Sequence, residues 1–128
     1  MSFNPFSGVT QTTSSPGPVS VGTTTFTALQ STTPPAGTYL VWAACWADWV
    51  SGSATSGSLH SARISAGGVP AADSIKSLHS PSTNNQIAFT LIAEVTVNGA
   101  QAIVFEMANN DNVVDVNAKN IQLMLLKT

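Results

Sequence analysis

Few side chains in this sequence have the chemistry of a catalytic site. The two histidines, His60 and His79, both lie in serine-rich segments that are typical of a protein surface. A Ser-His-Asp set could be drawn from any of the many serines, so it carries no information, and no G-x-S-x-G motif is present. We therefore expect structural or solvent-exposed histidines, no catalytic residues and no enzyme activity.

The single cysteine, Cys45, lies in the middle of the apolar stretch TYLVWAACWADWV. One cysteine cannot form an internal disulfide. A catalytic thiolate would need a base, and no histidine is close in the sequence. A small buried hydrophobic side chain is therefore the simpler interpretation.

The segment NNDNVVD superficially resembles a calcium-binding loop. Its amide and carboxylate oxygens are ligands that Ca²⁺ accepts, but the central glycine and the terminal glutamate of the EF-hand loop are absent. A polar turn between two strands is the better interpretation, and we expect no metal and no cofactor. The residues concerned are Asn109, Asn110, Asp111, Asn112 and Asp115.

The composition excludes several classes of partner. The 128 residues are enough for one domain, and only 8% of them are charged, against about 25% in an ordinary soluble domain. The four basic residues are scattered singly, whereas nucleic acids and anionic lipids bind clustered Lys and Arg. The sequence shows neither a signal peptide nor a run of about 18 apolar residues. We therefore expect no nucleic-acid and no membrane partner.

The elements that must position these residues are predicted to be strands. Residues 1–18 are rich in Ser, Thr, Gly and Pro, so we expect an extended N-terminal arm, with Phe3 and Phe6 as its contacts to a partner. Residues 19–128 then form the folded domain. Short strands with turn signals about every eight to twelve residues, and no sustained helical periodicity, predict an all-β antiparallel sandwich.

Individual strands follow from composition and alternation. Val19–Leu29 is rich in β-branched residues and predicts one strand, and LHSARIS predicts another that closes at Gly67-Gly68. A short strand is expected around Ile75–Leu78. Apolar and polar residues alternate in QIAFTLIAEVTV and again in AQAIVFEMAN, and the Asn98-Gly99 pair between them is typical of a tight hairpin. NIQLMLLKT closes the chain as a last strand.

The stretch TYLVWAACWADWV is apolar on both faces of its predicted strand, although an antiparallel strand on a monomer surface should have one polar face. One face, with residues of the later strands, is expected in the sandwich core. That core comprises Tyr39, Val41, Cys45, Phe89, Leu91, Ile103, Phe105 and Leu123. A two-layer sandwich has no layer to cover the other face, which therefore predicts a subunit interface that ends at Asp48. The interface comprises Leu40, Trp42, Ala44 and Trp46.

PPAGTYLVWAA resembles the start of the long strand in tumour necrosis factor-like and complement-like jelly rolls, where an aGxYxv signature follows a Pro-containing loop. FTLIAEVTVNGAQAIVFEM and NIQLMLL resemble the later hairpin and the closing strand of that family. The resemblance covers residues 34–128 and implies a jelly-roll β-sandwich that forms tight homotrimers. The long strand's axis-facing side is aromatic in that family, and Leu40, Trp42 and Trp46 fall on that side. The chain departs from the family at NGAQ, where an acidic residue often follows the glycine.

The low charge, the Ser/Thr-rich domain and the arm resemble bacteriophage structural proteins. The resemblance to trimeric decoration (cement) proteins of tailed-phage heads implies a virion protein that assembles in the host cytoplasm and binds the major capsid protein or other virion subunits. Two alternatives stay open. One is a tail fibre or spike domain. The other is a glycan-binding module in which Trp42 and Trp46, about 13 Å apart on a strand, stack on sugar rings; the few hydrogen-bonding side chains in that segment speak against it.

Overall fold

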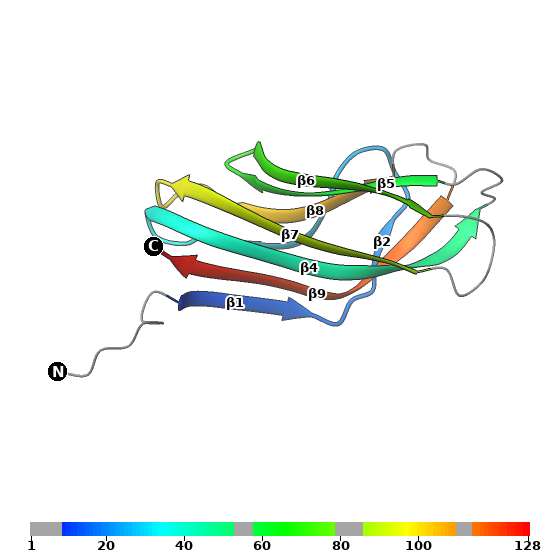
Figure 1. Cartoon of the computed structure of the whole chain (residues 1–128), viewed down its shortest axis with the longest axis horizontal. Coiled ribbons are helices and arrows are strands. Elements are labelled where there is room, and N and C mark those ends of the chain that lie inside the picture. Colours follow the sequence, from blue (N-terminus) through cyan, green and yellow to red (C-terminus); the bar gives the residue numbers. More distant parts are fainter. Residues whose placement is uncertain (1–8, 53–57, 79–85, 110–113) are drawn as a thin grey trace.

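The computed structural model describes residues 9–52, 58–78, 86–109 and 114–128. These residues form nine strands in two antiparallel sheets packed face to face, and they contain no helix (Figure 1). The predicted all-β jelly-roll sandwich is confirmed. Since no helix occurs in the described ranges, none there is long and apolar enough to cross a membrane.

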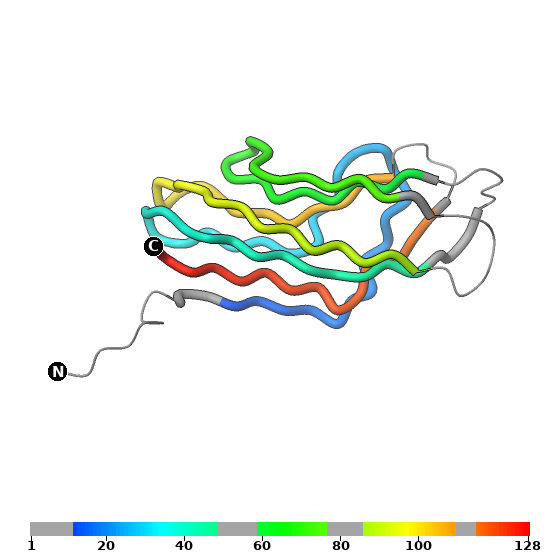
Figure 2. Tube along the Cα trace, viewed as in Figure 1, coloured from blue at the N-terminus to red at the C-terminus, as the bar shows by residue number. Residues whose placement is uncertain are grey.

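The first sheet has the strand order β1-β9-β4-β7, and β2 continues it beside β9. In chain order its strands are β1 (Val9–Ser15), β2 (Val19–Val21), β4 (Gly37–Gly52), β7 (Gln86–Val97) and β9 (Val114–Lys127). The long strands β4 and β9 run antiparallel through its middle, as the chain trace in Figure 2 shows. β4 therefore has a paired neighbour on each side.

The second sheet has the strand order β3-β8-β5-β6. Its strands are β3 (Thr27–Thr32), β5 (Ser58–Ala66), β6 (Val69–Leu78) and β8 (Ile103–Asn109). From β2 to β9 every connection passes from one sheet to the other, except that β5 and β6 are consecutive and paired. Such crossing connections are what place strands distant in sequence side by side in a jelly roll.

The core fills the space between the two sheets, and all eight side chains predicted for it are buried. Alternation accounts for this, because every second residue of β4 and β7 points to the same face of the sheet. Tyr39 has no exposed surface, and its hydroxyl donates a 2.8 Å hydrogen bond to the carbonyl oxygen of Pro35. This bond fastens the Pro-rich loop to the start of β4.

The tight hairpin predicted at Asn98-Gly99 is wrong. β7 and β8 belong to different sheets, so residues 98–102 carry the chain across the sandwich instead of returning it alongside β7. Gly99 has a positive φ of 92°, whereas Asn98 does not. Asn98 instead accepts a hydrogen bond at Oδ1 from the N–H of Ala100, 2.9 Å away, which closes a local turn.

Two other strand predictions had wrong boundaries. Val19–Leu29 is not one strand, because its start (β2) pairs with β9 in the first sheet and its end enters β3 in the second. The strand expected around Ile75–Leu78 extends back to Val69 and forms all of β6. The turn predicted at Gly67-Gly68 is confirmed, since it joins β5 to β6 with φ values of 58° and 82°.

Part of the segment expected as an extended N-terminal arm, residues 1–18, is a strand of the sandwich. Residues 9–15 form β1, the edge strand of the first sheet, and pair antiparallel with β9 of the same chain (Figure 1). Phe3 and Phe6 lie outside the described residues. The role of these two phenylalanines as partner contacts stays a prediction, and any free arm must end before residue 9.

Candidate oligomer interface

The two faces of β4 differ in solvent exposure. The side chains that point inward, at every second residue from Tyr39 to Ala47, are all buried. On the outward face Leu40 and Trp42 are exposed at 39% and 49%, while Ala44 and Trp46 are half-buried. The four residues predicted for the subunit interface therefore share one outer face of the first sheet.

Neighbouring strands extend this apolar surface on both sides of β4. Trp42 is paired with Ile92 of β7 and with Met124 of β9, which gives a row of three large apolar side chains across the sheet. Ile92 is 62% exposed and Met124 is 37% exposed. Leu40 is paired with Leu126 of β9 in the next row. We call Leu40, Trp42, Ile92, Met124 and Leu126 the apolar face.

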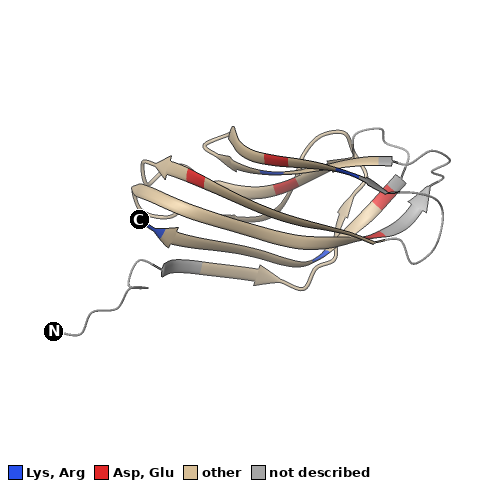
Figure 3. Ribbon diagram, in the orientation of Figure 1, with Lys and Arg blue, Asp and Glu red and all other residues tan. Residues whose placement is uncertain are grey.

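The apolar face exposes an area on the order of 300–400 Å², which equals the largest apolar patch on many monomeric proteins and commonly marks an interaction site. A small hollow of about 130 Å³ lies within it, lined by Trp42, Ala44, Gln122 and Met124. Charged residues are few on the chain and leave the middle of β4 free of charge (Figure 3). Glu94, which is paired with Leu40, is the exception at the border of the face.

A charged pair marks the far end of this surface. The Nζ atom of Lys119 lies 2.7 Å from Oδ2 of Asp48 and 5.8 Å from the centroid of the Trp46 ring. The ammonium group therefore partly covers Trp46 and neutralises the carboxylate. Asp48 is where the sequence predicts the apolar seam to end, and the ion pair agrees with that position.

The structure describes one of the two histidines with catalytic potential. His60 has no exposed surface, so its expected place in a surface segment is wrong: β5 lies between β8 and β6, and the inward side of β5 is covered by the first sheet. A structural role for His60 agrees with this burial. His79 lies outside the described residues. That the chain is not an enzyme stays a prediction.

No group of three or more His, Cys, Asp and Glu side chains suited to a metal ion occurs among the residues that the structure describes. Asn109 is buried at the end of β8, and Asp115 lies in β9, where it is paired with Ser51. Residues 110–113 of the predicted polar turn are outside the described ranges.

Cys45 is buried in the core at 5% exposure, as predicted, and burial raises the pKa of its thiol from 9.0 to about 12. The cause is desolvation, which penalises the thiolate in apolar surroundings. A thiol that stays protonated at neutral pH is a poor nucleophile. Cys45 is thus a packing residue in this structure.

The raised pKa of Cys45 predicts a loss of stability at alkaline pH. In the unfolded chain the thiol ionises near pH 9, whereas in the folded chain it keeps its proton until about pH 12. The stabilising contribution is therefore complete below pH 9 and is lost as the pH rises towards 12, by up to about 2 kcal/mol at pH 10.5. Urea unfolding at pH 8 and pH 10.5 should show a larger loss in the wild type than in Cys45→Ala. Equal losses in the two proteins would contradict the burial argument.

A structural contact that the sequence did not reveal lies on the outer face of the second sheet. Arg63 of β5 forms an ion pair with Glu106 of β8, at 2.5 Å between Nε and Oε1. Its guanidinium carbon also lies 3.7 Å from the centroid of the Phe26 ring. These contacts hold residue 26, just before β3, against the sheet. Residues 63, 106 and 26 are distant in sequence, so no local pattern could have indicated them.

Comparison with known proteins bears on the fold. No protein-family model matches the sequence, and no curated protein matches it either. Among solved structures, the chain is similar to the tumour necrosis factor Eiger from S. frugiperda, with a TM-score of 0.53 and 10% sequence identity. The match covers 73% of this chain and 60% of that chain, so this chain spans less than two thirds of the length of its neighbour. At this identity the similarity shows a tumour necrosis factor-like fold and nothing finer.

Proposed function

We propose that this chain is a structural protein that assembles into a homotrimer through the apolar face, and that the trimer decorates a virion. The observation that carries the assembly step is the row of Ile92, Trp42 and Met124, whose side chains are exposed at 62%, 49% and 37%. Burial of such a row against a second copy removes apolar area from water at about 25 cal/mol per Å². In a closed ring of copies, the apolar face of every copy is buried against a neighbour.

The number three rests on the resemblance of the β4 segment to trimeric jelly rolls. The tumour necrosis factor-like fold is consistent with a trimer of this kind. Stacking of sugar rings on Trp42 and Trp46 would be a competing use of the same surface. Lys119 partly covers the Trp46 ring, so Trp42 and Trp46 are less suitable as a flat platform for sugar stacking. This favours assembly as the use of the surface.

The virion setting rests on the sequence, because few charges, many Ser and Thr residues and an N-terminal segment with two phenylalanines resemble decoration proteins of phage heads. The partner would be the major capsid protein or another virion subunit, bound by three copies at once so that weak contacts multiply. A tail fibre or spike is the alternative location on the same particle.

Light scattering after size exclusion tests the assembly step. The expected mass is about three times the 13.2 kDa of one chain at micromolar concentration. A stable monomer would disprove the proposed assembly.

Virion binding is tested separately, by deleting residues 1–8 only. The deletion should stop before β1, because residues 9–15 belong to the sheet. We expect an intact trimer that no longer sediments with the phage heads to which the full chain binds. Full binding by the truncated trimer would remove Phe3 and Phe6 from the partner contacts.

A further inference from the structure

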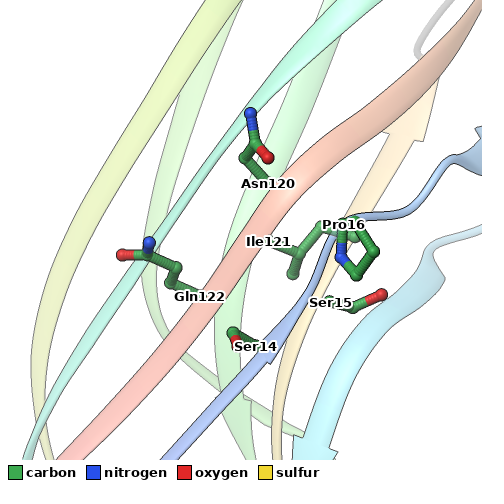
Figure 4. A pocket seen from close by; sticks show the side chains of 6 residues that line it. All are labelled: Ser14, Ser15, Pro16, Asn120, Ile121 and Gln122. Carbon is green, nitrogen blue, oxygen red and sulfur yellow. The ribbon is translucent and has the colours of Figure 1, made fainter.

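A polar pocket of about 320 Å³ lies at the corner where the chain leaves β1 and turns towards β2. Figure 4 shows it from close by, with Asn120 and Gln122 extending to the same side of β9 and Ser15 and Pro16 at the end of β1. Its lining residues are Ser14, Ser15, Pro16, Asn120, Ile121 and Gln122. Neither the core nor the apolar face accounts for this pocket.

A β-bulge builds one wall of the pocket. The register between β4 and β9 shifts between Ala44 and Trp46, and Asn120 lies on β9 at this shift. Asn120 has a φ of +49°, the one positive value among the described residues other than glycine. Bulges turn a side chain away from its regular direction, and left-handed residues that are not glycine gather at functional sites. The bulge therefore sets the direction of the Asn120 side chain, whose amide lines the pocket.

The other wall is fixed by the turn after β1. The N–H of Asn120 donates a 3.2 Å hydrogen bond to the carbonyl oxygen of Pro16. The N–H of Gly17 donates another of 3.2 Å to the Ser15 hydroxyl. These bonds tie the turn to the bulge, so both walls are already in place without a ligand. A preformed pocket loses less entropy when it binds a ligand.

The lining chemistry selects the class of ligand. Ser14 supplies a hydroxyl, and Asn120 and Gln122 supply amides, groups that both donate and accept hydrogen bonds. No lining residue is charged, so nothing in the pocket favours a phosphate, a sulfate or a carboxylate. Pro16 adds apolar surface, whereas Ile121 is fully buried in the core beneath the pocket. Neutral groups that donate and accept hydrogen bonds, next to apolar surface, match the hydroxyls and the C–H faces of a sugar. The pocket volume is at the small end of the range for ligand pockets.

We propose that this pocket binds one residue of a neutral carbohydrate, with Ser14, Asn120 and Gln122 hydrogen-bonding to its hydroxyls. The site differs from a stack on Trp42 and Trp46, and it overcomes the shortage of hydrogen-bonding groups around those rings. Gln122 also lines the hollow beside Trp42, so the pocket borders the apolar face at the β1 edge of the sheet. Three pockets on one trimer would bind a glycan-coated surface with avidity.

The experiment applies the full-length wild type to an array of neutral, sialylated and sulfated glycans and then measures solution affinity for the best neutral ligand by calorimetry. We expect neutral glycans to bind. Asn120→Gly is the decisive variant, because glycine accepts the positive φ while the amide is lost. Its affinity, and that of Gln122→Ala, should fall at least about tenfold. Gln86→Ala removes an exposed glutamine of the same sheet, beside Trp46, and should bind as the wild type does.

The proposal would be overturned if no neutral glycan bound, if only sialylated or sulfated glycans bound, or if Asn120→Gly and Gln122→Ala kept the affinity of the wild type. Loss of affinity in Gln86→Ala alone would place the sugar at Trp46 instead and would also overturn it. Light scattering on the same samples separates this proposal from the assembly step. A monomer that binds neutral glycan through Asn120 would support the pocket while disproving the trimer, and a trimer without glycan binding would do the reverse.

Discussion

Replacing Trp42 with glutamate should convert the proposed trimer into monomers at micromolar concentration. Trp42 lies in the centre of the apolar face, between Ile92 and Met124, and exposes 49% of its surface. Tryptophans at the centre of an interface are frequent hot spots whose truncation costs 2 kcal/mol or more. Three buried carboxylates near one axis would add repulsion and an unpaired buried charge. Light scattering should then give the mass of a single chain.

A matched control distinguishes loss of an interface from a general effect of a surface charge. Ile75 is 60% exposed on β6, at the edge of the opposite sheet. Ile75→Glu therefore adds the same charge at a similarly exposed apolar residue away from the apolar face, and it should leave the trimer intact. A trimeric Trp42→Glu variant, or a monomeric Ile75→Glu variant, would show that the apolar face is not the interface.

The sequence predicted well those features that depend on alternation within one strand. Counting every second residue in TYLVWAACWADWV separates Tyr39, Val41 and Cys45 from Leu40 and Trp42, and the structure separates them in the same way. The side-chain period of a strand is two whatever lies beside it. The core residues of β7, β8 and β9 were predictable for the same reason.

Strand pairing was less predictable, because it depends on residues far apart in the chain. Asn98-Gly99 has the composition of a hairpin turn, but β7 finds its partner in β4, about 50 residues earlier, and β8 pairs with β3 and β5. His60 shows the same limit. Its serine-rich neighbours indicate a surface, whereas the central place of β5 in its sheet buries it.

The polar pocket had no signal in the sequence. It exists because β9 shifts its register against β4 at Asn120 while β1 ends on the other side of β9. Neither event is encoded by residues adjacent in sequence, and Ser14 and Gln122 become neighbours only through antiparallel pairing. The apolar face, in contrast, was partly predictable from the sequence. Leu40 and Trp42 were predicted to share an outer face, whereas Ile92 and Met124 join it only because their strands pair with β4.

Both proposals meet at β9, whose outward side chains serve two surfaces. Met124 and Leu126 extend the apolar face, whereas Asn120 and Gln122 form the polar pocket. The change from apolar to polar lies between Met124 and Gln122, next to the bulge that separates Gln122 from Lys119. A trimer built on the C-terminal end of this strand would thus leave its middle, at Asn120 and Gln122, at the rim, where three identical pockets would face a common surface. Assembly and carbohydrate binding are in this way compatible uses of one sheet.

Gly17→Ala should be the most destabilising glycine substitution in the corner that builds the pocket, lowering the free energy of unfolding by about 3 kcal/mol or more. Gly17 has a φ of +73°, and a Cβ atom there would lie 2.5 Å from the carbonyl oxygen of Ala118, a backbone atom that cannot rotate away. Gly68→Ala is the matched control. Its φ is +82°, but nothing lies within 4 Å of the added Cβ, so the cost should be only the conformational one, about 1 kcal/mol. Urea unfolding of the two variants at equal protein concentration measures the difference. Equal losses would mean that the turn after β1 moves to accept the methyl group, and the preformed wall of the pocket would then be disproved.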